Sequence, residues 1–226
     1  MGYFTPELFQ FLRRLKRNNN REWFNKNKDR YIEDVQQPVL DFVAAVGPGL
    51  SKISKNFLAD PRPSGGSMFR IHRDVRFSKD KSLYKTAVGV NFGHRARKDV
   101  HYPGFYLHLE PAEVFVGAGI WQPDTKTATM IRESIVERPA QWKKVAHGAP
   151  FSKGYQLMDD ALVRAPRGFD PEHPLVDDLR LKSFIGIRTL DERTATSARF
   201  LDTFLSACRD AGPFVKFLCE AVGAQY

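Results

Sequence analysis

The sequence has little cysteine and none of the common catalytic motifs. Its two cysteines, Cys208 and Cys219, lie eleven residues apart and form neither a C-x-x-C pair nor a zinc-binding spacing. We therefore expect two buried free thiols, which suit a reducing compartment. The chain also lacks a Walker loop, a G-x-G-x-x-G loop, a G-x-S-x-G elbow and an H-x-x-x-H pair. No motif thus points to nucleotide hydrolysis, dinucleotide binding, serine-hydrolase chemistry or a helical zinc site.

Long apolar runs are absent as well. No stretch approaches the roughly 20 apolar residues that a membrane-spanning helix needs, and the start, MGYFTPELFQFL, lacks the features of a signal peptide. We therefore expect a cytoplasmic protein with no membrane partner. No RNA-recognition aromatic signature or zinc finger is present, and we expect no cofactor and no metal. The oligomeric state is left open.

Acidic residues are fewer than lysines and arginines, which gives the chain of 226 residues a net charge of +9. This balance favours polyanions, phosphate metabolites or acidic surfaces as partners; a basic but inert surface is the alternative. The length fits one large domain. Hydrophobic residues make up 42% of the chain and include 18 phenylalanines, so we expect a soluble fold with a core rich in aromatic rings.

Helices are expected at the N-terminus. Thr5-Pro6 is typical of a helix start, and the asparagines at 18–20 should end that helix and cap a second, long one. Pro38 should kink this second helix, and Gly47-Pro48-Gly49 should end it. A short helix is then expected over about 50–57.

Four strands are expected in the middle of the chain, at 86–92, 104–110, 114–121 and 183–190, because apolar residues alternate there between turn signals. Helices are expected at 125–137 and 139–146, an irregular segment at 151–181, and C-terminal helices from about 193, broken at Gly212-Pro213. The pattern predicts a single α+β domain over 1–226. Its largely antiparallel sheet of about four or more strands, within a core of about 68–190, should pack against N-terminal helices (about 5–58) and C-terminal helices (about 193–222).

Glycines interrupt three of these strands, at Gly89, Gly117, Gly119 and Gly186. A glycine weakens a strand interior, so each one needs a reason. Alternation puts Phe115, Gly117, Gly119 and Trp121 on one face, and the hairpin neighbour can present Tyr106, His108 and Glu110 on the same face. Such a floor would let a ligand approach the backbone closely. Tight helix packing or β-bulges are the alternative explanation.

The stretch RIHRDVRFSKDKSLYK, residues 70–85, contains six Lys or Arg among its sixteen residues. As a helix it would align Arg70, Arg73 and Arg76; as a strand it would place Arg70, Asp74 and Arg76 on one face. Apolar residues interleave with the basic ones and should hold them against the body of the domain (Met68, Phe69, Ile71, Val75, Phe77, Leu83 and Tyr84). Arginine offers a planar donor fork that suits phosphate or carboxylate, and a neighbouring Arg should keep the pKa of Asp74 low.

We therefore predict a basic, aromatic-rimmed pocket for a phosphorylated or carboxylated small molecule. Tyr106 and Trp121 would stack on the ligand, and His108 is a weak catalytic candidate for proton transfer. The ligand-binding set is Arg70, Arg73, Asp74, Arg76, Lys81, Tyr84, Lys85, Tyr106 and Trp121. Two alternatives stay open: a nucleic-acid-associated module that binds phosphates through the same surface, and a structural salt-bridge network with the acidic residues of the N-terminal helices.

Two further groups of polar residues give weaker signals. His94, His101 and His108 recur every seven residues, but a loop intervenes, so we do not expect a shared metal. Glu110 and Glu113 flank a turn, and solvated carboxylates are expected there rather than catalytic ones.

Four segments carry a family resemblance: NNNREWFNKNKDRY at 18–31, FRIHRDVRFSKDKSLYKT at 69–86, PGFYLHLEPAEVFVGAGIWQP at 103–123 and VRAPRGFDPEHPLVDDLRLKSF at 163–184. On these segments the chain resembles the bacterial and fungal family catalogued as domain of unknown function 2461, although that family usually has proline at the position of Leu83. The resemblance implies a compact, single-domain α+β protein in the cytoplasm. It implies no activity and no catalytic residues.

Overall fold

An antiparallel sheet forms the centre of the computed structural model, which describes residues 2–74, 76, 80–96, 102–149 and 151–226. Among these residues the sheet has five strands in the order β1-β2-β3-β5-β4. The strands are β1 (Val88–Gly93), β2 (Gly104–Glu110), β3 (Glu113–Ile120), β4 (Gln156–Leu157) and β5 (Phe184–Leu190). The α+β class and the antiparallel pairing are confirmed. The sequence did not indicate β4, because a strand of two residues has no alternation to detect.

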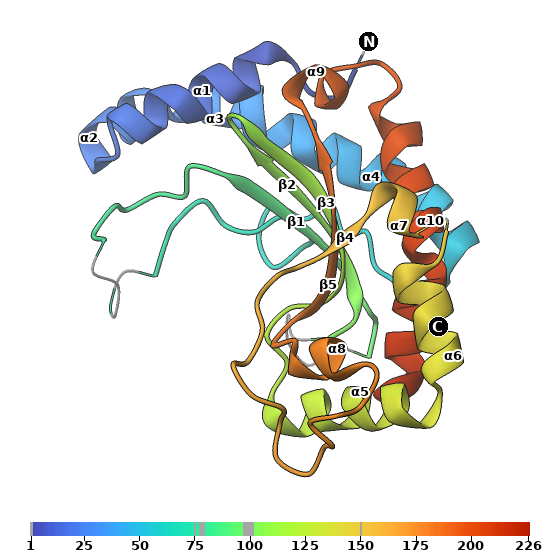
Figure 1. Ribbon diagram of the computed structural model, residues 1–226. Coiled ribbons are helices and arrows are strands. Elements are labelled where there is room, and N and C mark those ends of the chain that lie inside the picture. Colours follow the sequence, from blue (N-terminus) through green and yellow to red (C-terminus); the bar gives the residue numbers. More distant parts are fainter. Residues whose placement is uncertain (1, 75, 77–79, 97–101, 150) are drawn as a thin grey trace.

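One face of the sheet is covered by helices. The residues of β2 that were expected to share a buried face, Phe105, Leu107 and Leu109, are fully buried. The long helices α4 (Gln37–Ile53) and α10 (Phe200–Ala221) pack against each other, and α10 also contacts β3. The ring centroids of Phe92 on β1 and Phe204 on α10 lie 5.1 Å apart. Figure 1 shows both helices on the same side of the sheet, so the opposite face is the one available for a site.

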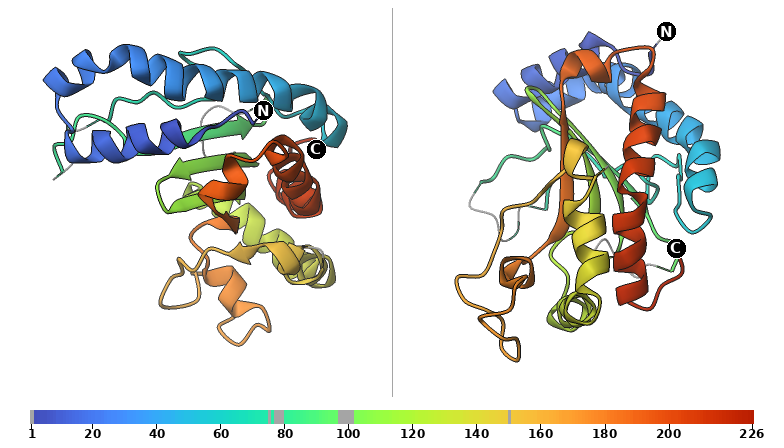
Figure 2. Two further views of the ribbon diagram at one scale, coloured as in Figure 1. Left: turned by 90° about the horizontal axis from the view of Figure 1, so that it is seen from above. Right: turned by 45° about the vertical axis from the view of Figure 1, so that its right-hand side comes forward.

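The N-terminal helices form a second layer. They comprise α1 (Pro6–Arg17), α2 (Arg21–Lys26), α3 (Lys28–Tyr31) and a π-helical turn, η1 (Ile32–Gln36), which leads into α4. Asn20 caps α2 as expected, since its side chain accepts a hydrogen bond from the backbone N–H of Trp23. The π-turn ends two residues before Pro38, where the missing N–H interrupts the ordinary helical hydrogen bonds. Helix α1 lies beside the continuous rod of α3, η1 and α4 (Figure 2).

Two predicted helix ends are wrong. Helix α4 continues through Gly47-Pro48-Gly49 to Ile53, so the short helix expected over 50–57 does not form. Helix α10 likewise continues through Gly212-Pro213. At Gly49 a Cβ atom would lie 2.4 Å from Cδ1 of Leu205, so this glycine allows α4 and α10 to pack closely. Burial of the apolar faces outweighs the roughly 3 kcal/mol that an internal proline costs.

The remaining helices lie beside α10 or near the ends of the sheet (Figure 1). They are α5 (Thr125–Glu137), α6 (Pro139–Trp142), η2 (Lys143–His147), α7 (Phe151–Gly154), α8 (Val176–Arg180) and α9 (Glu192–Ala195). Both cysteines are free and buried in α10, as expected. Within the described ranges, every helix is too short or too polar to cross a bilayer.

The described residues of the basic stretch, 70–74, 76 and 80–85, form neither the helix nor the strand considered from the sequence, and we call this irregular segment the arm. Isolated bridges join Met68 to Val90 and His72 to Tyr84. The side chain of Asn19 holds Tyr84 from the other side, through hydrogen bonds of 2.9 Å to its carbonyl and from its N–H. These contacts fix the base of the arm, which extends from the sheet (Figure 1). Val75 and Phe77, which we expected to help anchor it, lie outside the described residues.

Candidate functional site

The open face of the sheet carries the residues that the alternation assigned to it. Tyr106 pairs with Gly117, and His108 pairs with Phe115, across the β2–β3 ladder. Gly89 of β1 pairs with His108 from the other side. The prediction that Tyr106 and His108 share a face with Gly117 is therefore confirmed.

An apolar cavity of about 340 Å³ lies on this face. Its floor is the sheet backbone, and aromatic side chains stand around it. Trp121 is 47% exposed, so its indole forms part of the rim. The lining residues are Phe69, Asn91, Tyr102, Gly104, Phe105, Tyr106, His108, Phe115, Gly117, Ala118, Gly119, Trp121, Met158, Ile185 and Ile187.

Glycine occupies the four strand positions for different structural reasons. A Cβ atom at Gly89 would lie 2.5 Å from the Tyr106 hydroxyl, and one at Gly186 would lie 2.4 Å from the Phe151 ring, so close packing explains both. Gly119 has φ of +131°, a backbone conformation that favours glycine. A Cβ atom at Gly117, by contrast, would make ordinary contacts, the nearest at 3.5 Å to Tyr106. Packing does not require glycine at Gly117, and its absent side chain leaves the cavity floor open.

A second, polar cavity of about 430 Å³ adjoins the first. The two cavities share Phe69, Tyr106 and His108. The full lining of the polar cavity is Lys16, Asn19, Phe69, Arg73, Asp80, Ser82, Tyr84, Lys85, Thr86, Ala87, Gly89, Tyr106 and His108. The arm thus contributes the polar end of a composite site whose apolar end is the sheet face.

Only some of the predicted cations line this cavity. Arg73 and Lys85 do, whereas Arg70, Arg76 and Lys81 are exposed and contribute to neither cavity. Asp74 is also exposed, and it accepts a hydrogen bond of 2.6 Å from Arg76. That bond holds the pKa of the Asp74 carboxyl below its usual value, in the direction expected from the sequence.

The ion pairs shown for the arm are local. Arg73 pairs with Asp80, and Arg76 pairs with Asp74. Two acidic residues of the N-terminal helices pair within those helices: Glu22 with Lys26, and Asp34 with Arg30. The structural salt-bridge alternative therefore finds no support among these pairs.

Lys85 is the most distinctive cation of the site. Its side chain is half-buried, and Nζ lies 5.1 Å from the centroid of the Phe69 ring. Burial lowers the pKa of Lys85, and the nearby positive charge of Arg70 lowers it further. Lys85 forms no ion pair with the residues that the structure describes. A half-buried ammonium group next to a like charge is stabilised by an incoming anion.

Two tyrosines of the predicted ligand-binding set differ in how they can contribute to the site. Tyr84 lines the polar cavity, but its ring stacks on Phe24 with centroids 4.1 Å apart and is buried, so it serves mainly to hold the arm. Tyr106 stands between the two cavities, and burial raises its pKa to about 12. It is therefore a neutral hydrogen-bonding group at neutral pH.

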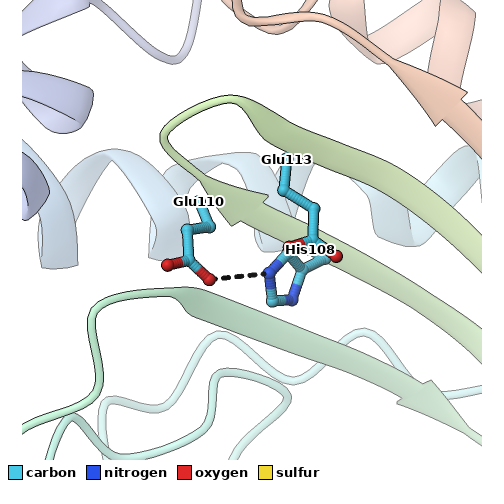
Figure 3. Close-up of side chains that lie close together, drawn as sticks. All are labelled: His108, Glu110 and Glu113. Carbon is cyan, nitrogen blue, oxygen red and sulfur yellow. Dashed lines mark ion pairs between the residues drawn. The ribbon is translucent and has the colours of Figure 1, made fainter.

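His108 lies where the cavities meet. Its ring stacks on Phe115 with a centroid distance of 4.6 Å, and Nδ1 lies 3.3 Å from the Tyr106 hydroxyl. Burial lowers the pKa of His108, while the carboxylates of Glu113 and Glu110 oppose that shift. Nε2 lies 3.6 Å from Oε2 of Glu110 (Figure 3).

The sequence did not identify one polar residue of the site, Lys16. Lys16 of α1 lines the polar cavity, and its Nζ lies 3.3 Å from Oε1 of Glu110. Glu110 is partly buried by these contacts, whereas Glu113 is exposed as expected.

His94, from the histidines that recur every seven residues, is buried, and its Nε2 lies 2.6 Å from the carbonyl oxygen of Gln225. His101 lies outside the described residues.

The family model described as "Conserved hypothetical protein (DUF2461)" matches residues 7–217 of the chain. This match contains all four segments on which the resemblance was based. No curated protein matches the chain at a significant level.

Proposed function

The chain belongs to the DUF2461 family of conserved hypothetical proteins, which lends it no activity, and we propose from the site itself that it binds a small molecule with a flat apolar body and a phosphate or carboxylate group. The observation that supports this most directly is the pair of adjoining cavities, one apolar and one polar, that share Phe69, Tyr106 and His108. A molecule with those two parts would occupy both.

The apolar cavity suits the body of such a ligand. Its volume of about 340 Å³ is typical of a small-molecule site. Gly117 has no side chain above the floor, so a flat group can approach the backbone, and Tyr106 and Trp121 can contact its faces or edges. The Tyr106 hydroxyl, at the boundary between the two cavities, would fix the orientation of the ligand.

The polar cavity suits the anion. Lys85 brings a half-buried positive charge, Arg73 and Lys16 bring two more, and Tyr106 brings a hydroxyl group. Charge-assisted hydrogen bonds to a phosphate or carboxylate are about twice as strong as neutral ones. The repulsion between Lys85 and Arg70, which helps to lower the pKa of Lys85, would be relieved by the same anion. A catalytic role for His108 stays a prediction that this proposal does not require.

A thermal-shift screen with phosphates, nucleotides and aromatic carboxylates tests the proposal, since a ligand that prefers the folded state raises its melting temperature. Lys85→Met and Lys81→Met form a matched pair, because Lys81 is exposed and contributes to neither cavity. We expect hits that are lost in Lys85→Met and retained in Lys81→Met. An absence of hits, or equal hits in both variants, would contradict the proposal.

Nucleic-acid binding is the outcome that would replace it. In that case affinity for duplex DNA would fall with salt, by about 0.9 in log affinity per unit of log salt for each phosphate contacted. Lys81→Met would then weaken binding about as much as Lys85→Met, because phosphate contacts of this kind add up over an exposed surface.

A further inference from the structure

A second group of side chains lies at the end of the β2–β3 hairpin and overlaps the proposed ligand site only at His108. It consists of His108, Glu110 and Glu113, whose potential ligand atoms all lie within 4.8 Å of one another. Figure 3 shows the three side chains, with a dashed line between His108 and Glu110, which form an ion pair only when the imidazole is protonated. We call these three residues the hairpin cluster.

The hairpin brings the three side chains to one face. Glu110 pairs with Glu113 as the last pair of the ladder, and His108 stands two residues before Glu110 on the same strand. The turn between the strands places Ala112 at φ of 68°, and its N–H donates a hydrogen bond of 2.9 Å to Glu192 of α9. The geometry is therefore fixed by the ladder and by a contact with a separate helix.

The histidine provides an independent reason to expect a ligand. Nε2 of His108 is buried, and it finds no hydrogen-bond partner among the residues that the structure describes. Its distance of 3.6 Å from Oε2 of Glu110 is too long for a hydrogen bond. The other ring nitrogen faces the Tyr106 hydroxyl at 3.3 Å. A metal-binding histidine usually has this arrangement, with one nitrogen on the ion and the other held by a neighbour.

We propose that the hairpin cluster binds a first-row divalent transition-metal ion through Nε2 of His108 and one carboxylate oxygen each from Glu110 and Glu113. One imidazole and two carboxylates suit Mn²⁺, Fe²⁺ or Zn²⁺ better than Mg²⁺ or Ca²⁺, which prefer oxygen alone. Ligand atoms about 2.1 Å from an ion lie about 3 to 4 Å apart. A small rotation of the exposed Glu113 side chain closes the remaining distance.

Lys16 opposes the ion. Its Nζ lies 3.3 Å from Oε1 of Glu110, so it competes electrostatically for the same carboxylate. The Lys16 side chain is 66% exposed and has room to move away. Removing its charge, in Lys16→Met, should therefore strengthen metal binding at least threefold, whereas metal bound elsewhere on the surface would not respond to this change.

Calorimetric titration of the chelator-treated full chain with MnCl₂, ZnCl₂ and MgCl₂ tests the proposal. We expect one Mn²⁺ or Zn²⁺ per chain and much weaker Mg²⁺ binding. Glu113→Gln and His108→Gln should each weaken Mn²⁺ binding at least tenfold. Glu133→Gln, an exposed glutamate of α5, is the matched control and should leave affinity unchanged. Because Glu113 is exposed, its variant should fold even if His108→Gln does not.

Two results would overturn the metal site. One is the absence of stoichiometric Mn²⁺ and Zn²⁺ binding at metal concentrations up to about 1 mM, which is already weak binding. The other is equal Mn²⁺ affinity in Glu113→Gln and in Glu133→Gln. Because these titrations contain no organic ligand, their outcome does not depend on whether the proposed small-molecule site is correct.

Discussion

Gly117 is the position at which the apolar cavity can be filled with least effect on the fold. A Cβ atom there would lie 3.5 Å from Cβ of Tyr106 and 3.9 Å from the ring of Phe115, both ordinary contacts. Valine also favours strands more than glycine, on a scale that spans about 1 kcal/mol. We therefore expect Gly117→Val to leave the free energy of unfolding unchanged or to raise it by up to about 1 kcal/mol.

The same substitution should weaken ligand binding. A flat ring lying on the floor hides about 50 to 100 Å² of apolar surface, which contributes about 1.3 to 2.5 kcal/mol at about 25 cal/mol per Å². Valine would displace the ring, so affinity should fall by about 10- to 70-fold. Gly117→Ala, which adds only one carbon, should have a smaller effect of the same sign.

Urea denaturation and calorimetry with the best screening hit measure the two effects separately. Gly47→Ala is the control, because its Cβ atom would make an ordinary contact of 3.8 Å with Ala59, in a helix away from the cavities. It should stabilise the protein by about 0.5 to 1 kcal/mol and leave affinity unchanged. If Gly117→Val folds normally and keeps affinity within about twofold, the ligand does not lie on this floor, and the reasoning is refuted.

Three further predictions follow from single residues. Lys85→Met should lower the affinity for an anionic ligand by about 10- to 100-fold, because one charge-assisted contact is lost. Because the pKa of Lys85 is lowered and an anion favours the charged ammonium, the affinity of the wild type should fall as the pH rises toward 10.5, and an affinity independent of pH by calorimetry would contradict this. Gly119→Ala should lose at least about 2 kcal/mol in urea denaturation, since its Cβ atom would lie 2.0 Å from the carbonyl oxygen of Phe184 at φ of +131°, and a neutral effect would show that this backbone relaxes. Arg132→Met should cost about 2 to 4 kcal/mol in the same assay, because the buried guanidinium donates to the carbonyls of Leu179 and Leu181, and a loss under about 1 kcal/mol would mean that water replaces it.

The sheet and its open face could be predicted because alternation is a local signal. The pattern of β2 alone assigned Phe105 to the core and Tyr106 to the opposite face, and the tight hairpin then fixed which β3 residues faced them. Helix ends were less predictable. Gly49 and Gly212 look like breakers in the sequence, yet both lie inside long helices that tertiary packing stabilises.

The candidate site was predicted in part. Lys85, Arg73, Tyr106, His108 and Trp121 line the two cavities, whereas the exposed arginines of the arm do not. Sequence spacing could not separate them, because the described residues of the arm form neither helix nor strand and so follow no fixed period. Lys16 was not found because its role depends on how α1 packs over the end of β2, a contact between residues 94 positions apart in the chain.

A crystal structure of the protein with its best phosphate- or carboxylate-bearing hit tests the central claim most directly. The account predicts one molecule that spans both cavities, with its anionic group within about 3 Å of Nζ of Lys85, the distance of a charge-assisted hydrogen bond, and its flat body over Gly117. A ligand bound elsewhere, or one whose anion is held by the exposed Arg70 and Arg76 while the cavity floor stays uncovered, would contradict it.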